Sequence, residues 1–265
     1  MGDKQCGRQP GDGPGSIMTS LRFADDILLV ARSLPQLKQM IADVRCECAK
    51  AGLELHPDKT KIQHNGIGYG SGVTMARVGD MNIEVLHPTK SNVYLGRALT
   101  LINVHDIELE HRLKKAWAKF RVFKQDLTDK AIPLHLRLKL FHSVVTPTAL
   151  YGCSSWVMTV AREDKLRSAQ LKMMRAILGR QRITQPHGDL ETWVEWVQRV
   201  TTEVRQAMEA NNIPHWVDAQ RCKLDSWHER LGRMSCERWA RKTLDWMPEG
   251  CRSRGRPCSR WSDQF

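Results

Sequence analysis

Two adjacent acidic residues, Asp25 and Asp26, form the most chemically suggestive pattern in the sequence. Apolar residues flank them, Phe23–Ala24 before and Ile27–Val30 after, which is the pattern of a β-hairpin with the acids at its tip. Two carboxylates held together on a rigid ribbon repel each other and favour a bound cation. The pattern therefore indicates a divalent-cation site of the kind used in phosphoryl transfer. The alternative is plain turn chemistry, because aspartate tolerates tight turns.

The residues around the acid pair predict an α+β region. We expect the hairpin over Thr19–Ala31 and a helix over Leu34–Ala51, because Ser33 can cap that helix and Gly52 can end it. Turns rich in glycine, proline and asparagine then separate short apolar runs. We expect these runs to form strands at Leu53–Leu55, Thr60–Ile62, Thr74–Val78, Ile83–Leu86 and Asn92–Gly96.

After Gly96 the apolar residues recur at helical spacing. One stripe runs from Leu113 through Trp117 to Leu127, a second helix is expected after Pro133, a third over Leu166–Ile177, and a fourth begins at Trp193 with its apolar residues turned inward. Eight of the nine tryptophans follow residue 150, and we expect them to pack in the core more than to stack on bases.

The balance of charge argues for a polyanionic partner. Lysine and arginine number 41 against 29 acidic residues, a net charge of +12, so nucleic acid is the leading candidate, although many basic proteins bind none. No apolar run approaches the roughly 18 residues of a membrane span, so we expect no membrane partner. Eight cysteines without a C-x-x-C pair predict reduced thiols rather than disulfides or zinc knuckles.

Basic residues gather in two places. A row on the first helix of the second half could lie on a phosphate backbone, or could be a solvated helix face; it comprises Arg112, Lys114, Lys115, Lys119, Arg121 and Lys124. A second group near the C-terminus is extended and similar to an AT-hook core, for which we favour general nucleic-acid affinity over A·T preference. That group comprises Arg252, Arg254, Arg256 and Arg260.

The segment Phe23–Asp26 resembles the catalytic hairpin of reverse transcriptases, in the form common among non-LTR (LINE-like) retrotransposons. The order of later segments reinforces the resemblance. Gly52–Leu55 with Lys59 looks like the family's next motif, and Tyr94–Gly96 resembles its primer-grip strand. Similarity to the thumb is carried by Pro147, Leu150, Tyr151, Gly152 and Trp156, and similarity to the C-terminal segment of these polyproteins by 238–241 and 254–263.

The resemblance implies a division of the chain into a flexible segment at 1–18, a partial right-hand polymerase palm at 19–97, a helical thumb-like region at 98–180 and a helical, Trp-rich basic extension at 181–265. It implies an RNA-directed DNA polymerase, a nucleotidyltransferase that uses magnesium or manganese and a deoxynucleotide, with no other small-molecule cofactor. The implied partners are an RNA template and a DNA primer, in the nucleus or a cytoplasmic ribonucleoprotein.

Site roles follow from the same resemblance. Asp25 would bind the metal, with Asp26 as its less direct partner, and Lys59 would neutralise the leaving pyrophosphate unless it is simply a solvated lysine. The family's other metal-binding aspartate lies before the hairpin, whereas here 24 residues precede Asp25. We therefore expect a fragment with little or no polymerase activity alone. A non-catalytic nucleic-acid-binding module and a helical interaction protein remain as alternatives.

Overall fold

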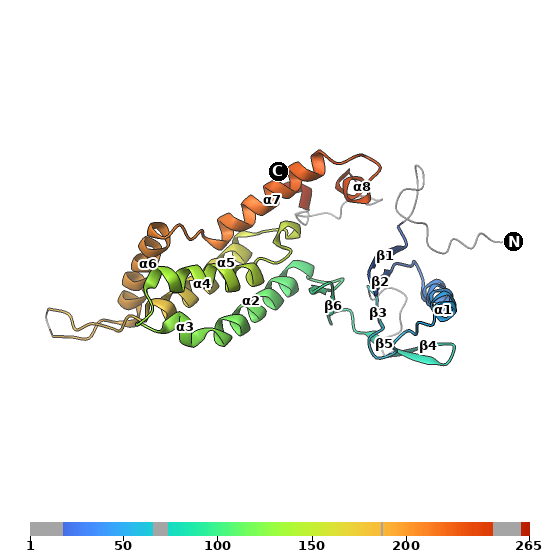
Figure 1. The fold of residues 1–265 in the computed structure, drawn as a ribbon, viewed down its shortest axis with the longest axis horizontal. Helices are drawn as coiled ribbons and strands as arrows, with labels where there is room; N and C mark the ends of the chain where they lie inside the picture. Colours follow the sequence, from blue (N-terminus) through green and yellow to red (C-terminus); the bar gives the residue numbers. More distant parts are fainter. Residues whose placement is uncertain (1–17, 66–73, 187, 246–260) are drawn as a thin grey trace, which may run out of the picture. The chain divides into compact units, whose positions relative to one another are not determined.

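The computed structural model describes residues 18–65, 74–186, 188–245 and 261–265. It is an α+β protein, with small sheets in the first part of the chain and helices in the rest (Figure 1). The chain divides into two compact units, Met1–Ile107 with Leu231–Gly250 and Glu108–Arg230 with Cys251–Phe265. The expected flexible segment at 1–18 lies, except for its last residue, outside the described residues.

The expected hairpin is confirmed. Strand β1 (Ser20–Phe23) pairs antiparallel with β2 (Asp26–Leu29), so that Ala24 and Asp25 form a two-residue turn. Helix α1 (Leu34–Lys50) follows, and the Ser33 side chain caps it by accepting a hydrogen bond from the Gln36 N–H.

A three-stranded sheet lies after α1, in the order β3–β5–β4. Strand β5 (Met81–Leu86) pairs in parallel with β3 (Lys61–Gln63) and antiparallel with β4 (Met75–Val78). One apolar cluster joins this sheet to α1, with Leu29 of the hairpin packed against it. The predicted strand at Leu53–Leu55 is absent, because this segment pairs with no described strand and only packs Leu55 on the cluster.

A second hairpin closes the first unit. Strand β6 (Asn92–Tyr94) pairs antiparallel with β7 (Arg97–Leu99). Strand β6 is shorter than the strand predicted at Asn92–Gly96, because Leu95 and Gly96 both take positive φ, 48° and 77°, and form the turn. This pair of left-handed angles is typical of a type I′ hairpin turn.

The second unit is helical. Its helices follow one another along the chain, and the connection after α4 contains one 3-10 turn. They are α2 (Val104–Val122, whose first four residues belong to the first unit), α3 (Lys124–Thr128), α4 (Leu134–Ala149), η1 (Cys153–Ser155), α5 (Val160–Leu178), α6 (Trp193–Ala210) and α7 (Trp216–Gly232). Two short helices complete the chain, α8 (Trp239–Asp245) and η2 (Trp261–Gln264). The predicted stripe from Leu113 to Leu127 is divided between α2 and α3, which break at Phe123. None of the described helices is long and apolar enough to cross a bilayer.

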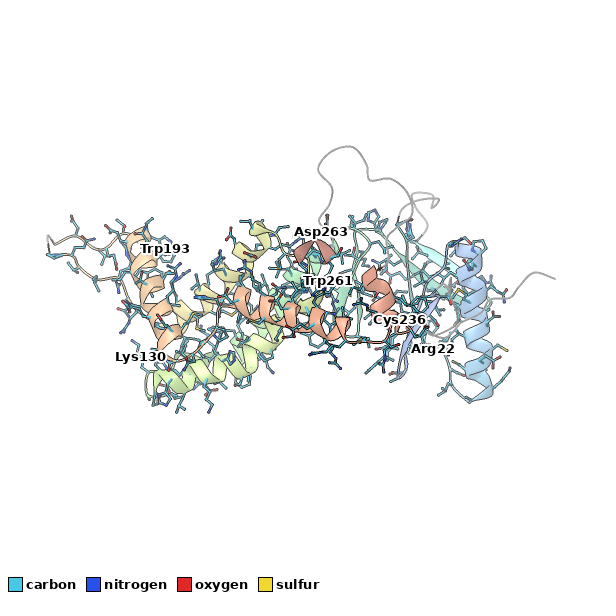
Figure 2. The ribbon with its side chains drawn as sticks, turned by 90° about the horizontal axis from the view of Figure 1, so that it is seen from above. Arg22, Lys130, Trp193, Cys236, Trp261 and Asp263 are labelled. Atoms are coloured by element: carbon cyan, nitrogen blue, oxygen red, sulfur yellow. The ribbon has the colours of Figure 1, made fainter. Side chains whose placement is uncertain are left out.

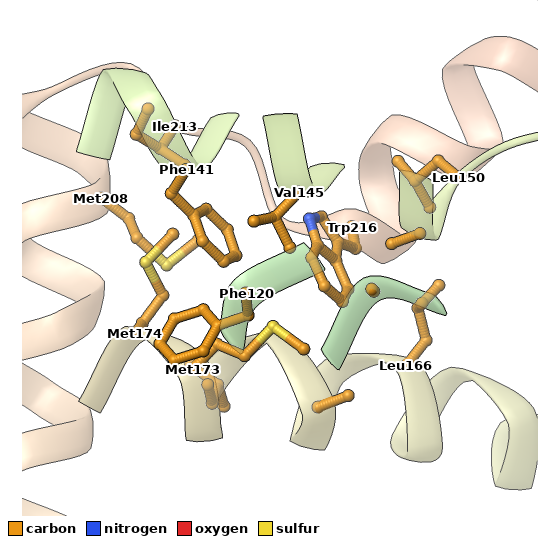
Figure 3. Close-up of a cluster of buried hydrophobic side chains, with 14 of the residues drawn as sticks. Phe120, Phe141, Val145, Leu150, Leu166, Met173, Met174, Met208, Ile213 and Trp216 are labelled. Carbon is orange, nitrogen blue, oxygen red and sulfur yellow. The ribbon is translucent and has the colours of Figure 1, made fainter. Parts of the chain in front are cut away.

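The core of the helical unit is built around aromatic side chains (Figure 3). Phe141 stacks on Trp216 with ring centroids 5.8 Å apart, and the Trp216 indole N–H donates to the Thr146 hydroxyl at 2.9 Å. Trp156 and Trp216 are buried as predicted. The inward placement of Trp193 is wrong: its side chain is 65% exposed and stacks on Trp196, because the buried face of α6 begins two turns later.

Candidate metal and nucleic-acid site

The acid pair lies at the tip of the first hairpin. Asp25 is the second turn residue, Asp26 is the first residue of β2 opposite Phe23, and both carboxylates are exposed. Within the described part of the chain, neither makes an ion pair. Their oxygens are therefore open to a ligand from solvent.

The turn is held in a costly backbone conformation. Ala24 has a φ of 51°, in the left-handed region that costs an L-residue about 1–2 kcal/mol. Strained residues persist only where the surrounding structure fixes them, and they concentrate at functional sites. Here the pairing of Phe23 with Asp26 fixes the turn, so Asp25 and Asp26 are held next to each other at the hairpin tip.

Contacts on both sides make the ribbon rigid. The Val30 N–H donates to the Thr19 carbonyl oxygen at 2.8 Å, which extends the ladder, and Leu29 packs against the apolar cluster below. Tyr94, from the turn end of β6, donates its hydroxyl to the Leu21 carbonyl oxygen at 3.4 Å. Burial and the nearby Asp26 carboxylate raise the pKa of Tyr94 above its ordinary value, so the phenol stays protonated as a donor.

The acid pair fits a magnesium ion in ligand type and falls short in ligand number. Carboxylate oxygens are hard ligands, and magnesium is commonly held by one or two carboxylates completed by substrate phosphates and water. In the parts of the chain that the structure describes, no group of three or more histidine, cysteine or acidic side chains could hold a metal. Asp25 and Asp26 could supply carboxylate ligands to such an ion only if other molecules complete its coordination.

Lys59 lies in an exposed turn, where its backbone N–H donates to the His56 carbonyl oxygen at 3.2 Å. No ion pair joins Lys59 to either acid among the described residues. The structure therefore does not bring this lysine into contact with the acid pair, and its role toward a leaving pyrophosphate stays a prediction.

Four of the predicted nucleic-acid-binding residues lie exposed on α2, namely Lys114, Lys115, Lys119 and Arg121. Residues four and seven apart share a helix face, so Lys115 and Lys119 form one row and Lys114 and Arg121 another. The Arg121 guanidinium donates to the Trp117 carbonyl oxygen at 3.4 Å, and the Lys119 ammonium lies 5.4 Å from the centre of the Phe123 ring. These contacts orient the two cations while leaving them accessible to a phosphate.

Arg112 does not belong to this exposed face. It is buried, with its guanidinium donating to the Glu108 carboxylate at 2.9 Å and lying 4.8 Å from the centre of the Tyr151 ring. The E-x-x-x-R spacing was the available signal, because residues four apart meet on a helix. The second basic group, Arg252, Arg254, Arg256 and Arg260, lies outside the described residues.

One cluster of charges was not predicted at all. Arg199 of α6 donates two hydrogen bonds to the Glu191 carboxylate, at 2.9 and 2.8 Å, and a third to Glu203 at 2.9 Å. Arg180 donates to the other Glu203 oxygen at 2.8 Å. The cluster fastens the connection before α6 to that helix, and the hydrogen bonds from Arg199 lower the pKa of Glu191.

Comparison with known proteins gives one informative similarity. The chain is 29% identical over 252 residues to an uncharacterized transposon-derived protein of Caenorhabditis elegans. The aligned region covers 95% of this chain and 85% of that protein. No family model matches the chain, and no solved structure matches it. The similarity suggests a transposon origin and carries no information on activity.

Proposed function

We propose that this chain is the palm and thumb portion of a reverse transcriptase from a non-LTR retrotransposon. The observation that carries the proposal is the acid pair, two exposed carboxylates at the tip of a two-residue hairpin turn with a left-handed Ala24. Similarity to a transposon-derived protein along nearly the whole chain supports the same origin.

In this function the hairpin presents Asp25 and Asp26 to magnesium, which when bound activates a primer 3′-hydroxyl and stabilises the leaving oxygen. The chain's own residues do the positioning. Tyr94 fixes the ribbon through Leu21, and the exposed cations of α2 bind the phosphate backbone of an RNA template paired with a DNA primer. Lys59 is the proposed neutraliser of the pyrophosphate formed from the deoxynucleotide.

The proposal is tested by titrating manganese, as a magnesium substitute, into the chain with a primer–template duplex and a deoxynucleotide present, and measuring water proton relaxation. The isosteric variant Asp25→Asn is expected to weaken binding at least about tenfold, since a charged ligand becomes neutral. Asp58→Asn, an exposed aspartate in another turn, is the matched control. Equal affinities for the wild type and Asp25→Asn would refute the metal site.

Primer extension separates catalysis from binding. We expect the 265 residues alone to extend a primer no better than their Asp25→Ala variant, because the acid pair provides only part of a two-ion site. Extension that depends on Asp25 would show that the chain is catalytic without further segments.

The second candidate is a non-catalytic nucleic-acid-binding module, which the exposed basic face of α2 favours. It predicts duplex binding that weakens with salt and a metal affinity unaffected by Asp25→Asn. A helical interaction protein, the third possibility, predicts that neither duplex nor metal raises the melting temperature.

A further inference from the structure

The connection between α4 and α5 has little regular structure of its own, yet part of it is buried. It contains one 3-10 turn, and Trp156 and Val157 are only 1% and 3% exposed. Buried backbone N–H and C=O groups need hydrogen-bond partners. Two carbonyl groups find them on neighbouring helices: Cys153 accepts from the Gln220 amide at 3.2 Å, and Val157 from the Arg162 guanidinium at 2.8 Å.

The C-terminal segment satisfies three more backbone groups of the same connection. The Trp261 indole N–H donates to the Ser154 carbonyl oxygen at 2.7 Å. The Gln264 side chain hydrogen-bonds to two backbone groups: it accepts from the Met158 N–H at 2.9 Å and donates to the Trp156 carbonyl oxygen at 3.0 Å. These partners are more than 100 residues apart in the sequence.

Aromatic contacts hold the other side of the segment. The His228 ring of α7 stacks on Phe265, with centroids 3.8 Å apart and planes at 17°. Trp261 meets both rings edge-on, 6.1 Å from His228 and 4.9 Å from Phe265 (Figure 2 labels Trp261). Ser262, between the anchors, is exposed. Trp261, Gln264 and Phe265 make the contacts described above with the connection and with α7.

We propose that the surface formed by Cys153–Met158 and His228 is a peptide-docking site, and that its occupant is the chain's own C-terminal segment Trp261–Phe265. The side chains that this surface recognises include Trp261, Gln264 and Phe265. Glutamine is specific at 264 because its amide carries both a donor and an acceptor, which match a carbonyl oxygen and an N–H two residues apart. Glutamate lacks the donor. This inference is independent of the polymerase proposal.

The test uses the full chain and a synthetic peptide with the sequence of residues 259–265, carrying a fluorophore at its N-terminus. In a full-length variant with Trp261→Ala and Gln264→Ala the tail no longer fills the site, so the peptide is expected to bind. Wild type, whose site is filled, is expected to bind it at least about tenfold more weakly, a difference of about 1.4 kcal/mol. Equal binding to both proteins would overturn the proposal.

Peptide variants test whether the Gln264 side chain determines binding. Gln264→Glu in the peptide is expected to weaken binding at least about tenfold, whereas Ser262→Ala, the exposed control, leaves it unchanged.

A second measurement does not depend on the double variant's stability. In full-length Gln264→Ala, which removes the acceptor of the Met158 N–H, the Met158 amide is expected to exchange with solvent at least about tenfold faster than in wild type, and unchanged exchange would contradict docking. A wild-type chain that dimerises with concentration, and whose Trp261→Ala variant does not, would show docking onto a second copy and refute docking within one chain.

Discussion

The hydroxyl group of Tyr94 donates a hydrogen bond to the main-chain carbonyl oxygen of Leu21, with 3.4 Å between the oxygen atoms. The bond joins the second hairpin to the strand that leads into the acid pair. A two-stranded hairpin is at best marginally stable alone, so this contact and the packing of Leu29 are what hold the acid-bearing ribbon in place.

Replacing Tyr94 by phenylalanine removes that bond and keeps the ring. We expect a loss of about 0.5–1.5 kcal/mol in the free energy of unfolding, measured by urea denaturation. Faster exchange at the amides of β1 and β2 should accompany the loss. Tyr151→Phe serves as the control: that tyrosine belongs to the other unit, so the hairpin amides should not respond. If the hairpin amides of Tyr94→Phe exchange at the wild-type rate, the hydrogen bond from Tyr94 to Leu21 does not stabilise the hairpin.

The turn residue Ala24 should accept glycine. Glycine adopts a positive φ without the penalty of about 1–2 kcal/mol, but gives up about 0.5–1 kcal/mol through a more flexible unfolded chain. Ala24→Gly is therefore expected to leave stability unchanged or raise it by up to about 1.5 kcal/mol. Ala24→Val should lower it, because a β-branched side chain is poorly compatible with φ near 51°. Thermal melting of both variants measures the difference, and a valine variant as stable as wild type would contradict the backbone geometry.

Signals carried by neighbouring residues predicted their elements well. Ser33 caps α1, and Gly52 follows the end of that helix with a φ of 73°, since a cap or a left-handed stop depends on residue type and local backbone alone. Strand β7, three residues long, was not predicted.

Contacts between segments far apart in the chain could not be predicted from the sequence. Tyr94 could be selected only by resemblance, and nothing in its neighbourhood says that it meets Leu21, 73 positions earlier. Arg112 is a different case, because its partner Glu108 lies only four residues away on the same helix. The prediction of an exposed arginine is wrong because charge usually means exposure, although the spacing already allowed a buried pair. Which residues pair across a fold depends on packing that no local pattern encodes.

The Glu191–Arg199 pair makes stability depend on pH. Hydrogen bonds from Arg199 hold the pKa of Glu191 below its ordinary value in the folded chain. A carboxyl group with a lowered folded pKa adds stability above its unfolded pKa, about 4.3, and this stability is lost as the pH falls through the folded value. Glu191→Gln should therefore melt below wild type at pH 7, and the gap should close below about pH 4.

The control for that experiment is Glu209→Gln, which alters an exposed carboxylate on the same helix as Arg199. Its melting temperature should follow wild type across the pH range. A gap for Glu191→Gln that stays constant from pH 7 to pH 3 would mean that the ionised carboxylate contributes nothing to the fold.

The exposed basic face of α2 predicts how duplex binding responds to salt. Each phosphate contact contributes about 0.9 to the slope of log affinity against log salt, so the double variant Lys115→Glu with Lys119→Glu should reduce that slope by about 2 and weaken binding at low salt. Arg205→Glu with Lys223→Glu changes the net charge equally at exposed positions of α6 and α7. If both double variants lose the same affinity, the effect belongs to total charge and α2 is no specific phosphate-binding face. Fluorescence anisotropy with a labelled RNA–DNA duplex at several salt concentrations gives both slopes.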